Sequence, residues 1–156
     1  SSDVCSSDLM FILIACTTVE TTDSKTFSGV DTVSADLEGD LAIRGSDSDE
    51  TQLDARSWGS ATDTDKAAER EADNRWSALQ DGNLLQLEGT PNGAGGIELA
   101  LSTPRRLDAD LVVDGDVDLV DLRGAIHVDG ADVQGAGVGG RVEIYGESSE
   151  IGRAHV

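Results

Sequence analysis

A nine-residue pattern occurs four times in this sequence and restricts its fold more than any other feature. In each copy, apolar residues stand at positions one, five and seven, glycine or alanine at position three, and glycine at the end. Apolar residues at every second position are typical of a β-strand with one buried face. The copies are residues 37–45, 107–115, 122–130 and 138–146, with a weaker half-copy at 85–89.

The last three copies start 15 and then 16 residues apart, which is a spacing expected of stacked strands. One such strand buries only a narrow apolar stripe, so several copies must stack to form a core. This predicts an all-β fold, namely a short right-handed β-solenoid with irregular N-terminal strands and one short helix. A meandering antiparallel sandwich is the competing arrangement. The predicted inner ladders are Leu111, Ile126 and Val142, and then Val113, Val128 and Ile144.

Upstream of these copies the strand pattern is less regular. A turn at residues 38–40 and a turn-rich segment at 90–96 separate short apolar runs. The predicted strands are residues 30–33, 37–45, 51–55, 84–87 and 97–101.

Residues 63–79 differ from the rest because their apolar side chains have helical spacing. Ala68, Ala72, Trp76 and Leu79 fall on one side of a helix, and no glycine or proline interrupts the segment. We therefore predict a short helix here, with Asp63 or Asp65 as its N-cap.

Both ends of the chain have the character of translated sequencing adapter. Residues 1–9 and 150–156 can be back-translated to DNA strands that are reverse complements of each other, a pattern similar to a widely used short-read adapter. Selection on a protein gives no reason for such complementarity. We therefore expect both segments to be artefacts and exclude them from the fold argument.

An apolar run at residues 10–16 ends in Leu13-Ile14-Ala15-Cys16 and is followed by polar residues. This tetrapeptide resembles the bacterial lipobox, which makes residues 10–16 the end of a truncated signal peptide and Cys16 the lipidated first residue of the mature protein. Residues 17–25 are the expected polar tether. Several acyl chains give stable anchoring, so the resemblance implies contact with a membrane in the cell envelope, on the outer-membrane or periplasmic side if the source has two membranes. A buried strand with an incidental cysteine is the alternative.

The order of these parts resembles a known family. After the lipoprotein-like start, strands around 27–30 precede the apolar strand 97–101, then Thr103-Pro104, and then the glycine-ended repeats. This order is similar to that of the putative adhesin β-solenoid domains of unknown function in bacterial surface proteins, over roughly residues 26–149. The chain departs from the family in having only about three consecutive repeats. No catalytic residue can be carried over from it.

The charge of the chain argues against one class of partner. With 31 acidic against 11 basic Lys and Arg residues, the net charge is −20, and no basic cluster offsets it. Such a surface repels nucleic acid, so we expect no nucleic-acid partner.

Candidate chemistry is confined to the outward positions of the repeats. Without the two end segments, His127 is the only histidine, which argues against a metal site built from several histidines and against a Ser-His-Asp triad. We expect His127 on the surface, between Val112 and Glu143. The outward positions include Asp110, Asp114, His127, Asp129, Arg141 and Glu143.

A calcium loop is the weaker interpretation of part of this face. Asp110, Asp114 and Asp121 have the spacing of positions 1, 5 and 12 of an EF-hand-like loop. Position 3 is Val112, which offers no side-chain oxygen, and no helix follows. We therefore interpret these acids as a solvated outer face and expect no cofactor.

We conclude from the sequence that the chain is a lipid-anchored β-solenoid of the cell envelope, not an enzyme, which acts as a structural or adhesion module and binds an envelope glycan or a protein. The alternative is a calcium-dependent, carbohydrate-associated binding module. A truncated polysaccharide-acting solenoid enzyme is a third class, but it would need a basic groove.

Overall fold

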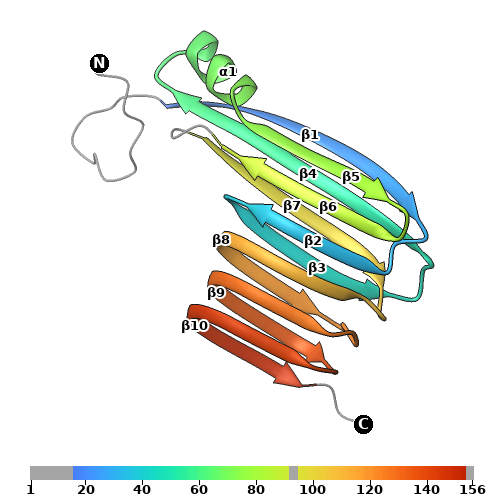
Figure 1. Cartoon of the computed structure of the whole chain (residues 1–156). Helices are drawn as coiled ribbons and strands as arrows, with labels where there is room; N and C mark the ends of the chain where they lie inside the picture. The colour runs from blue at the N-terminus through green and yellow to red at the C-terminus, as the bar shows by residue number, and fades with distance from the viewer. Residues whose placement is uncertain (1–15, 92–94, 154–156) are drawn as a thin grey trace.

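The computed structural model describes residues 16–91 and 95–153, whose strands form one curved ten-stranded sheet accompanied by one short helix (Figure 1). The predicted all-β class is therefore confirmed. None of the helical segments within the described ranges is long and apolar enough to cross a membrane. The elements are β1 (Thr17–Ser28), β2 (Thr32–Leu37), β3 (Asp40–Ser46), β4 (Glu50–Ala61), α1 (Thr64–Ala72), β5 (Arg75–Asp81), β6 (Leu84–Thr90), β7 (Gly95–Pro104), β8 (Asp108–Val120), β9 (Ile126–Val138) and β10 (Val142–Arg153).

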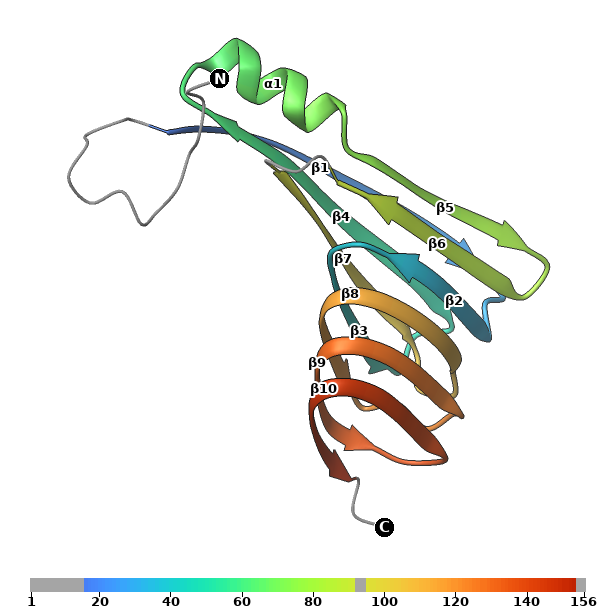
Figure 2. The same cartoon turned by 60° about the vertical axis from the view of Figure 1, so that its left-hand side comes forward.

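Parallel pairing organises the C-terminal half. β8 pairs with β9 and β9 with β10, all in parallel, and each of these strands is curved (Figure 2). The other edge of β8 pairs first with β2 and then with β3, so these two short strands together match one long strand. β6 and β7 pair in the same way with β2 and β3. We call the five layers β6–β7, β2–β3, β8, β9 and β10 the parallel stack.

The layers do not follow chain order. The layer β2–β3 lies between β6–β7 and β8, although β6 and β7 come after it in the sequence. Among the described strands, antiparallel pairing is confined to the β6–β7 end of the stack, where β5 pairs with β6, β4 with β7, and β1 with β4. The competing prediction of a meandering antiparallel sandwich is therefore not what the described strands form, since of these pairs only β5 and β6 are consecutive in the chain.

Each layer bends into two walls. The first wall contains β2, β6 and the first halves of β8, β9 and β10, the second wall contains β3, β7 and the second halves, and the core lies between them. Strands β2, β3, β6, β7, β8 and β9 alternate buried and more exposed residues, as the nine-residue pattern predicts, and Val142 and Ile144 at the start of β10 are half-buried against the same core. The largest fully buried side chains are Leu37, Leu41, Ile43, Leu53, Leu85, Leu87, Ile97, Leu99, Leu107, Leu111, Leu119 and Leu122.

The register between β8 and β9 differs from the predicted one. Ile126 lies opposite Ala109, not Leu111, while its predicted partner Val142 on β10 is confirmed. The true second ladder is Leu111, Val128 and Ile144. A slip of two residues keeps the same side chains inside, so alternation alone cannot detect it. The hydrogen bond from Ala109 N–H to Ala125 O, at 2.9 Å, belongs to the register that forms.

The predicted helix is shorter than expected. α1 starts after Asp63, whose side chain accepts a hydrogen bond from Lys66 N–H at 3.0 Å, and it ends at Ala72. Residues 75–81 instead form β5 along β6, with Leu79 largely exposed. The prediction that the helix extends through Trp76 and Leu79 is therefore wrong. After the turn at Asp73 and Asn74, hydrogen bonding of these residues to β6 stabilises a strand more than their helix propensity stabilises a helix.

The remaining strands agree with the prediction. The predicted turn at 38–40 joins β2 to β3, and the expected strands at 51–55, 84–87 and 97–101 lie within β4, β6 and β7. The strand expected at 30–33 forms slightly later, as β2.

The segments set aside at the chain ends are only partly described. Residues 17–25, expected to be a tether, lie in β1, paired along their length with β4. Residues 150–153 continue β10, whereas residues 1–15 and 154–156 lie outside the described residues. The adapter hypothesis stays a prediction.

Candidate functional site

A cluster of polar side chains lies on the outer face where β8, β9 and β10 begin. Asp110, His127 and Glu143 lie opposite one another on these three strands. His127 was expected between Val112 and Glu143, and the two-residue shift in register puts Asp110 in place of Val112. Nδ1 of His127 is 3.5 Å from Oε2 of Glu143, whose other oxygen accepts a hydrogen bond from Arg141 at 3.0 Å. His127 is on the surface as predicted, with its side chain 42% exposed.

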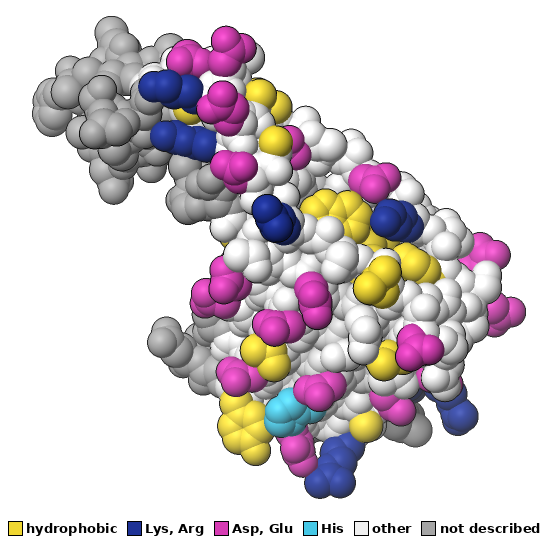
Figure 3. Space-filling model, turned by 45° about the horizontal axis from the view of Figure 1, so that its top comes forward, with side chains coloured by type: hydrophobic (Ala, Val, Ile, Leu, Met, Phe, Trp, Pro, Cys, Tyr) yellow, Lys and Arg dark blue, Asp and Glu magenta, His cyan; other side chains and the backbone are white. Residues whose placement is uncertain are grey.

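An aromatic ring lies beside this histidine. Tyr145 follows Glu143 by two residues on the same strand and is 60% exposed. Its ring centroid lies 5.3 Å from that of His127, with 53° between the ring planes. We call His127, Arg141, Glu143 and Tyr145 the outer-face patch. Figure 3 shows the histidine on this face between hydrophobic and acidic side chains.

The patch borders a shallow hollow of about 340 Å³. Its lining combines an imidazole, a guanidinium and a carboxylate with apolar side chains, and it contains neither a hydroxyl nor a thiol nucleophile. These groups can donate and accept hydrogen bonds around a bound polar molecule, while the tyrosine ring offers a flat apolar surface. The hollow is lined by Ala109, Ala125, Ile126, His127, Arg141 and Glu143.

The second wall of the parallel stack carries an acidic groove of about 290 Å³. Glu98 on β7 lies opposite Asp40 on β3, and Asp116 on β8 lies opposite Asp132 on β9. The amide of Asp116 donates to Oδ1 of Asp40 at 3.0 Å, so the two pairs form one row. Adjacent strands are only about 4.8 Å apart, so this row repels anionic ligands. Sequence reasoning missed it because its members come from four separate segments.

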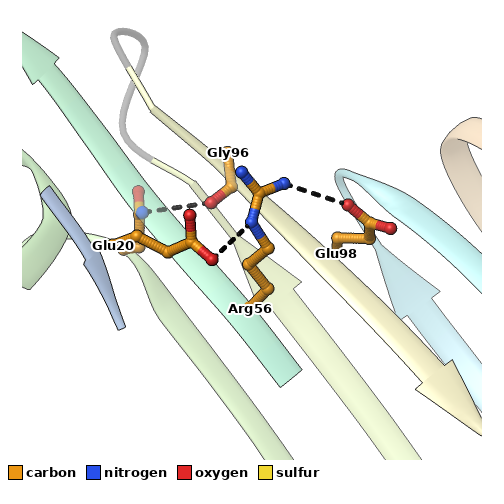
Figure 4. Close-up of polar contacts among 5 residues, drawn as sticks. Glu20, Arg56, Gly96 and Glu98 are labelled. Atoms are coloured by element: carbon orange, nitrogen blue, oxygen red, sulfur yellow. Dashed lines mark hydrogen bonds and ion pairs between the residues drawn. The ribbon is translucent and has the colours of Figure 1, made fainter. Parts of the chain in front are cut away.

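One arginine joins this acidic row to the N-terminal strands (Figure 4). Nε of Arg56 on β4 is 2.7 Å from Glu20 on β1, and its Nη1 is 3.3 Å from Glu98 on β7. Its guanidinium also lies 4.5 Å from the centroid of the Trp58 ring. The hydrogen bond from Arg56 lowers the pKa of Glu20, and the same bond raises the pKa of Arg56.

The three acids of the calcium interpretation are not brought together. Asp110 lies in the outer-face row with His127, Asp114 lies near the bend of β8, and Asp121 follows the end of β8 with a positive φ of 55°. Within residues 16–91 and 95–153, no group of three or more His, Cys, Asp or Glu side chains is arranged to hold a metal ion.

Cys16, the predicted lipidation site, lies directly before β1 and is exposed. Its thiol is not free in the structure. The residues of the lipobox before it lie outside the described part of the chain, and lipidation of Cys16 stays a prediction.

Comparison with known proteins gives distant structural likeness only. No family model matches the sequence, and no curated protein matches it. A solved structure described as a putative cell adhesion protein from Clostridium sporogenes is 8% identical, with a TM-score of 0.45, and covers 86% of this chain and 96% of its own. A putative adhesin from Bacteroides fragilis is 11% identical, with a TM-score of 0.37 and coverages of 86% and 97%.

A third solved structure has a different description. It is a putative lipid binding protein from Parabacteroides distasonis, 10% identical, with a TM-score of 0.38, and the match covers 85% of this chain and 59% of that one. At these identities and TM-scores, none of these likenesses decides a ligand or an activity.

Proposed function

We propose that this chain is a binding module of the bacterial cell envelope, built as a short right-handed β-solenoid, that holds a glycan against its outer face. The parallel register of β8, β9 and β10, with apolar side chains inside and polar side chains outside, supports the solenoid. The module is not an enzyme in this proposal, and it does not bind nucleic acid, since its net charge is −20.

The observation that carries the binding role is the exposed Tyr145 ring beside His127. A tyrosine that is 60% exposed adds nothing to the core, and its ring is presented from a strand held by pairing along its length with β9. Tyrosine is enriched at recognition surfaces because it offers a large rigid contact area at a low cost in side-chain entropy. The apolar face of a sugar ring fits such a surface, and Glu143 and Arg141 lie next to it to bond sugar hydroxyl groups.

The proposal concerns the mature protein, in which Cys16 is the first residue and carries the lipid that places the module on a membrane. The polar segment after this cysteine, which forms β1, then lies nearest the membrane, and the outer-face patch on β9 and β10 lies at the far end of the sheet (Figure 1). Such an arrangement presents the patch away from the lipid surface, where an envelope glycan can reach it.

Titration with soluble glycans tests the proposal. Oligomers of N-acetylglucosamine and neutral glucans, added to the protein and followed by calorimetry, should give saturable binding to at least one probe. Tyr145→Ala should weaken that binding by about tenfold or more, which corresponds to the loss of one hot-spot aromatic residue.

Leu79→Ala is the matched control. Leu79 is 64% exposed on β5, at the opposite end of the sheet, so its removal takes away a similar exposed apolar side chain without touching the patch. Equal binding by the wild type and Tyr145→Ala, or equal weakening by both variants, would remove the outer-face patch from the proposal.

A further inference from the structure

A separate cleft of about 740 Å³ lies where the turns before β8 and β9 meet the turn between β5 and β6. It is larger than the hollow beside His127 and shares none of its lining residues. Its lining is polar throughout except for one glycine. The lining residues are Asp31, Thr32, Asn83, Arg106, Asp108, Arg123 and Gly124.

Two arginines of this cleft come from consecutive layers of the parallel stack. Arg106 precedes β8 and Arg123 precedes β9, and both are exposed. Arg123 N–H donates to Arg105 O at 2.8 Å, so the turn that carries Arg123 lies directly on the turn that carries Arg106. The fold therefore holds two guanidinium groups at the same cleft.

Neither of these guanidinium groups has an ion-pair partner among the described residues. Other arginines of this acidic protein do have one: Arg56 pairs with Glu20, Arg105 with Asp47, and Arg141 with Glu143. The cleft thus holds two guanidinium groups without carboxylate partners, on a surface where acids outnumber bases almost three to one.

The carboxylates of the cleft are bound to other donors. Oδ1 of Asp108 accepts a hydrogen bond from Ala125 N–H at 2.9 Å, and Oδ2 of Asp31 accepts one from the Asn83 amide at 2.9 Å. Oδ1 of Asp31 also accepts from the Thr32 hydroxyl at 3.0 Å. These bonds position both acids against the backbone and the side chains of the turns, and they leave the N–H groups of Arg106 and Arg123 available to a ligand.

Gly124, the one lining residue of the cleft without a side chain, lies where the two turns meet. A Cβ atom at Gly124 would overlap the carbonyl oxygen of Leu107. The turn before β9 therefore packs tightly onto the turn before β8, and this contact fixes the two arginine-bearing turns against each other.

We infer that Arg106 and Arg123 form a second binding site, which takes an oxyanion group, a phosphate or a carboxylate, carried by an envelope ligand. Each guanidinium is a planar fork of donors that matches two oxygens of such a group. The two arginines balance the charges of Asp31 and Asp108, so the cleft is locally neutral and does not repel an anion as the acidic groove does. This inference goes beyond the proposed glycan site and uses different residues.

Titration with small anions tests the inference. Inorganic phosphate and trigalacturonate are added separately to the protein at constant ionic strength, and the Asn83 side-chain amide and the Gly124 amide are followed by NMR. Saturable shifts with phosphate alone assign a phosphate group, and saturable shifts with trigalacturonate alone assign a carboxylate. No saturable shift with either probe overturns the site.

The variants separate a built site from general charge. The double variant Arg106→Gln/Arg123→Gln should weaken binding by about tenfold or more, and Arg106→Lys/Arg123→Lys should give an intermediate loss, because lysine keeps the charge but not the fork. Arg44→Gln is the matched control, since Arg44 is exposed on β3 and no ion pair of the described residues includes it. Equal weakening by Arg44→Gln would show attraction by charge alone and would overturn the inference.

The two sites can fail independently. Tyr145→Ala should leave phosphate or trigalacturonate binding unchanged within about twofold, because Tyr145 does not line the cleft. Loss of the anion shifts in Tyr145→Ala, with the fold intact by its thermal unfolding midpoint, would contradict a separate site.

Discussion

The Nε atom of Arg56 on β4 lies 2.7 Å from Oε1 of Glu20 on β1, and this ion pair links the first strand of the sheet to its neighbour. The same guanidinium contacts Glu98 on β7, so one side chain connects three strands. Both side chains of the Arg56–Glu20 pair are partly exposed, so the pair adds little to the free energy of unfolding. Its main effect is to hold β1 in place at the edge of the sheet.

Glu20→Gln should make stability less dependent on pH in the acidic range. The hydrogen bond from Arg56 lowers the pKa of Glu20 below its usual value in the folded protein. The pair therefore stabilises the fold above the usual pKa of a glutamate, and this contribution is lost as pH falls through the lowered pKa. Thermal unfolding midpoints measured between about pH 6 and pH 3 should fall more for the wild type than for Glu20→Gln. Asp23→Asn changes the same charge on the same strand and is the control; a wild-type curve parallel to that of Glu20→Gln would contradict the prediction.

Ile126→Asp should unfold the protein. Ile126 is 2% exposed between Ala109 and Val142, so the variant buries a carboxylate without a partner, at a cost of about 4 kcal/mol or more. His127→Asn, one residue later, should change the free energy of unfolding by less than roughly 0.5 kcal/mol, because its side chain lies on the outer face. Denaturant unfolding measures both values, and the reverse ranking would mean that the two faces of β9 are exchanged.

Gly45→Ala should destabilise the parallel stack by roughly 1 to 3 kcal/mol. A Cβ atom at Gly45 would overlap the carbonyl oxygen of Asp121, which is backbone and cannot move aside cheaply. Arg44→Ala, on the exposed position just before it, should have little effect. Chemical denaturation of the two variants checks the difference, and an unchanged unfolding midpoint in Gly45→Ala would show that the two backbones are farther apart.

Asp121→Asn should be nearly neutral, whereas Asp121→Ala should cost about 1 kcal/mol. The reason is the positive φ of 55° at this position, which asparagine and aspartate tolerate better than alanine. Melting temperatures with calcium and with a chelator should rank the variants identically. A calcium-induced rise in the wild type that disappears in Asp121→Asn would instead favour the calcium-dependent module.

Cys16→Ala should abolish lipid attachment. When a complete bacterial lipoprotein signal precedes residue 16, the wild type should incorporate labelled palmitate and partition into detergent, because a lipidated cysteine carries the anchoring acyl chains. Ser24→Ala, a polar position of β1, should label as the wild type does. Equal labelling of Cys16→Ala and the wild type would remove the lipid anchor from the proposed function.

Little of the candidate site could be predicted from sequence. The outward position of His127 follows from alternation along β9, and its neighbours on β10 follow from the predicted register between β9 and β10. Its neighbour Asp110 depends on the register between β8 and β9, which alternation does not encode. The cleft between Arg106 and Arg123 was missed for a related reason. Its residues come from turns around positions 31, 83, 106 and 123, which become neighbours only when the layers stack.

The sequence alone determined which side of each repeat strand is buried. Period-two alternation assigns Leu111, Val128 and Ile126 to the inside whatever their partners are, because side chains on a strand point alternately to opposite faces. The tertiary structure decided the order of the layers, with β2–β3 placed between β6–β7 and β8, and it decided the register between β8 and β9. These features depend on how whole layers pack against one another, and a shift of two residues or an exchange of layers leaves every local apolar pattern unchanged.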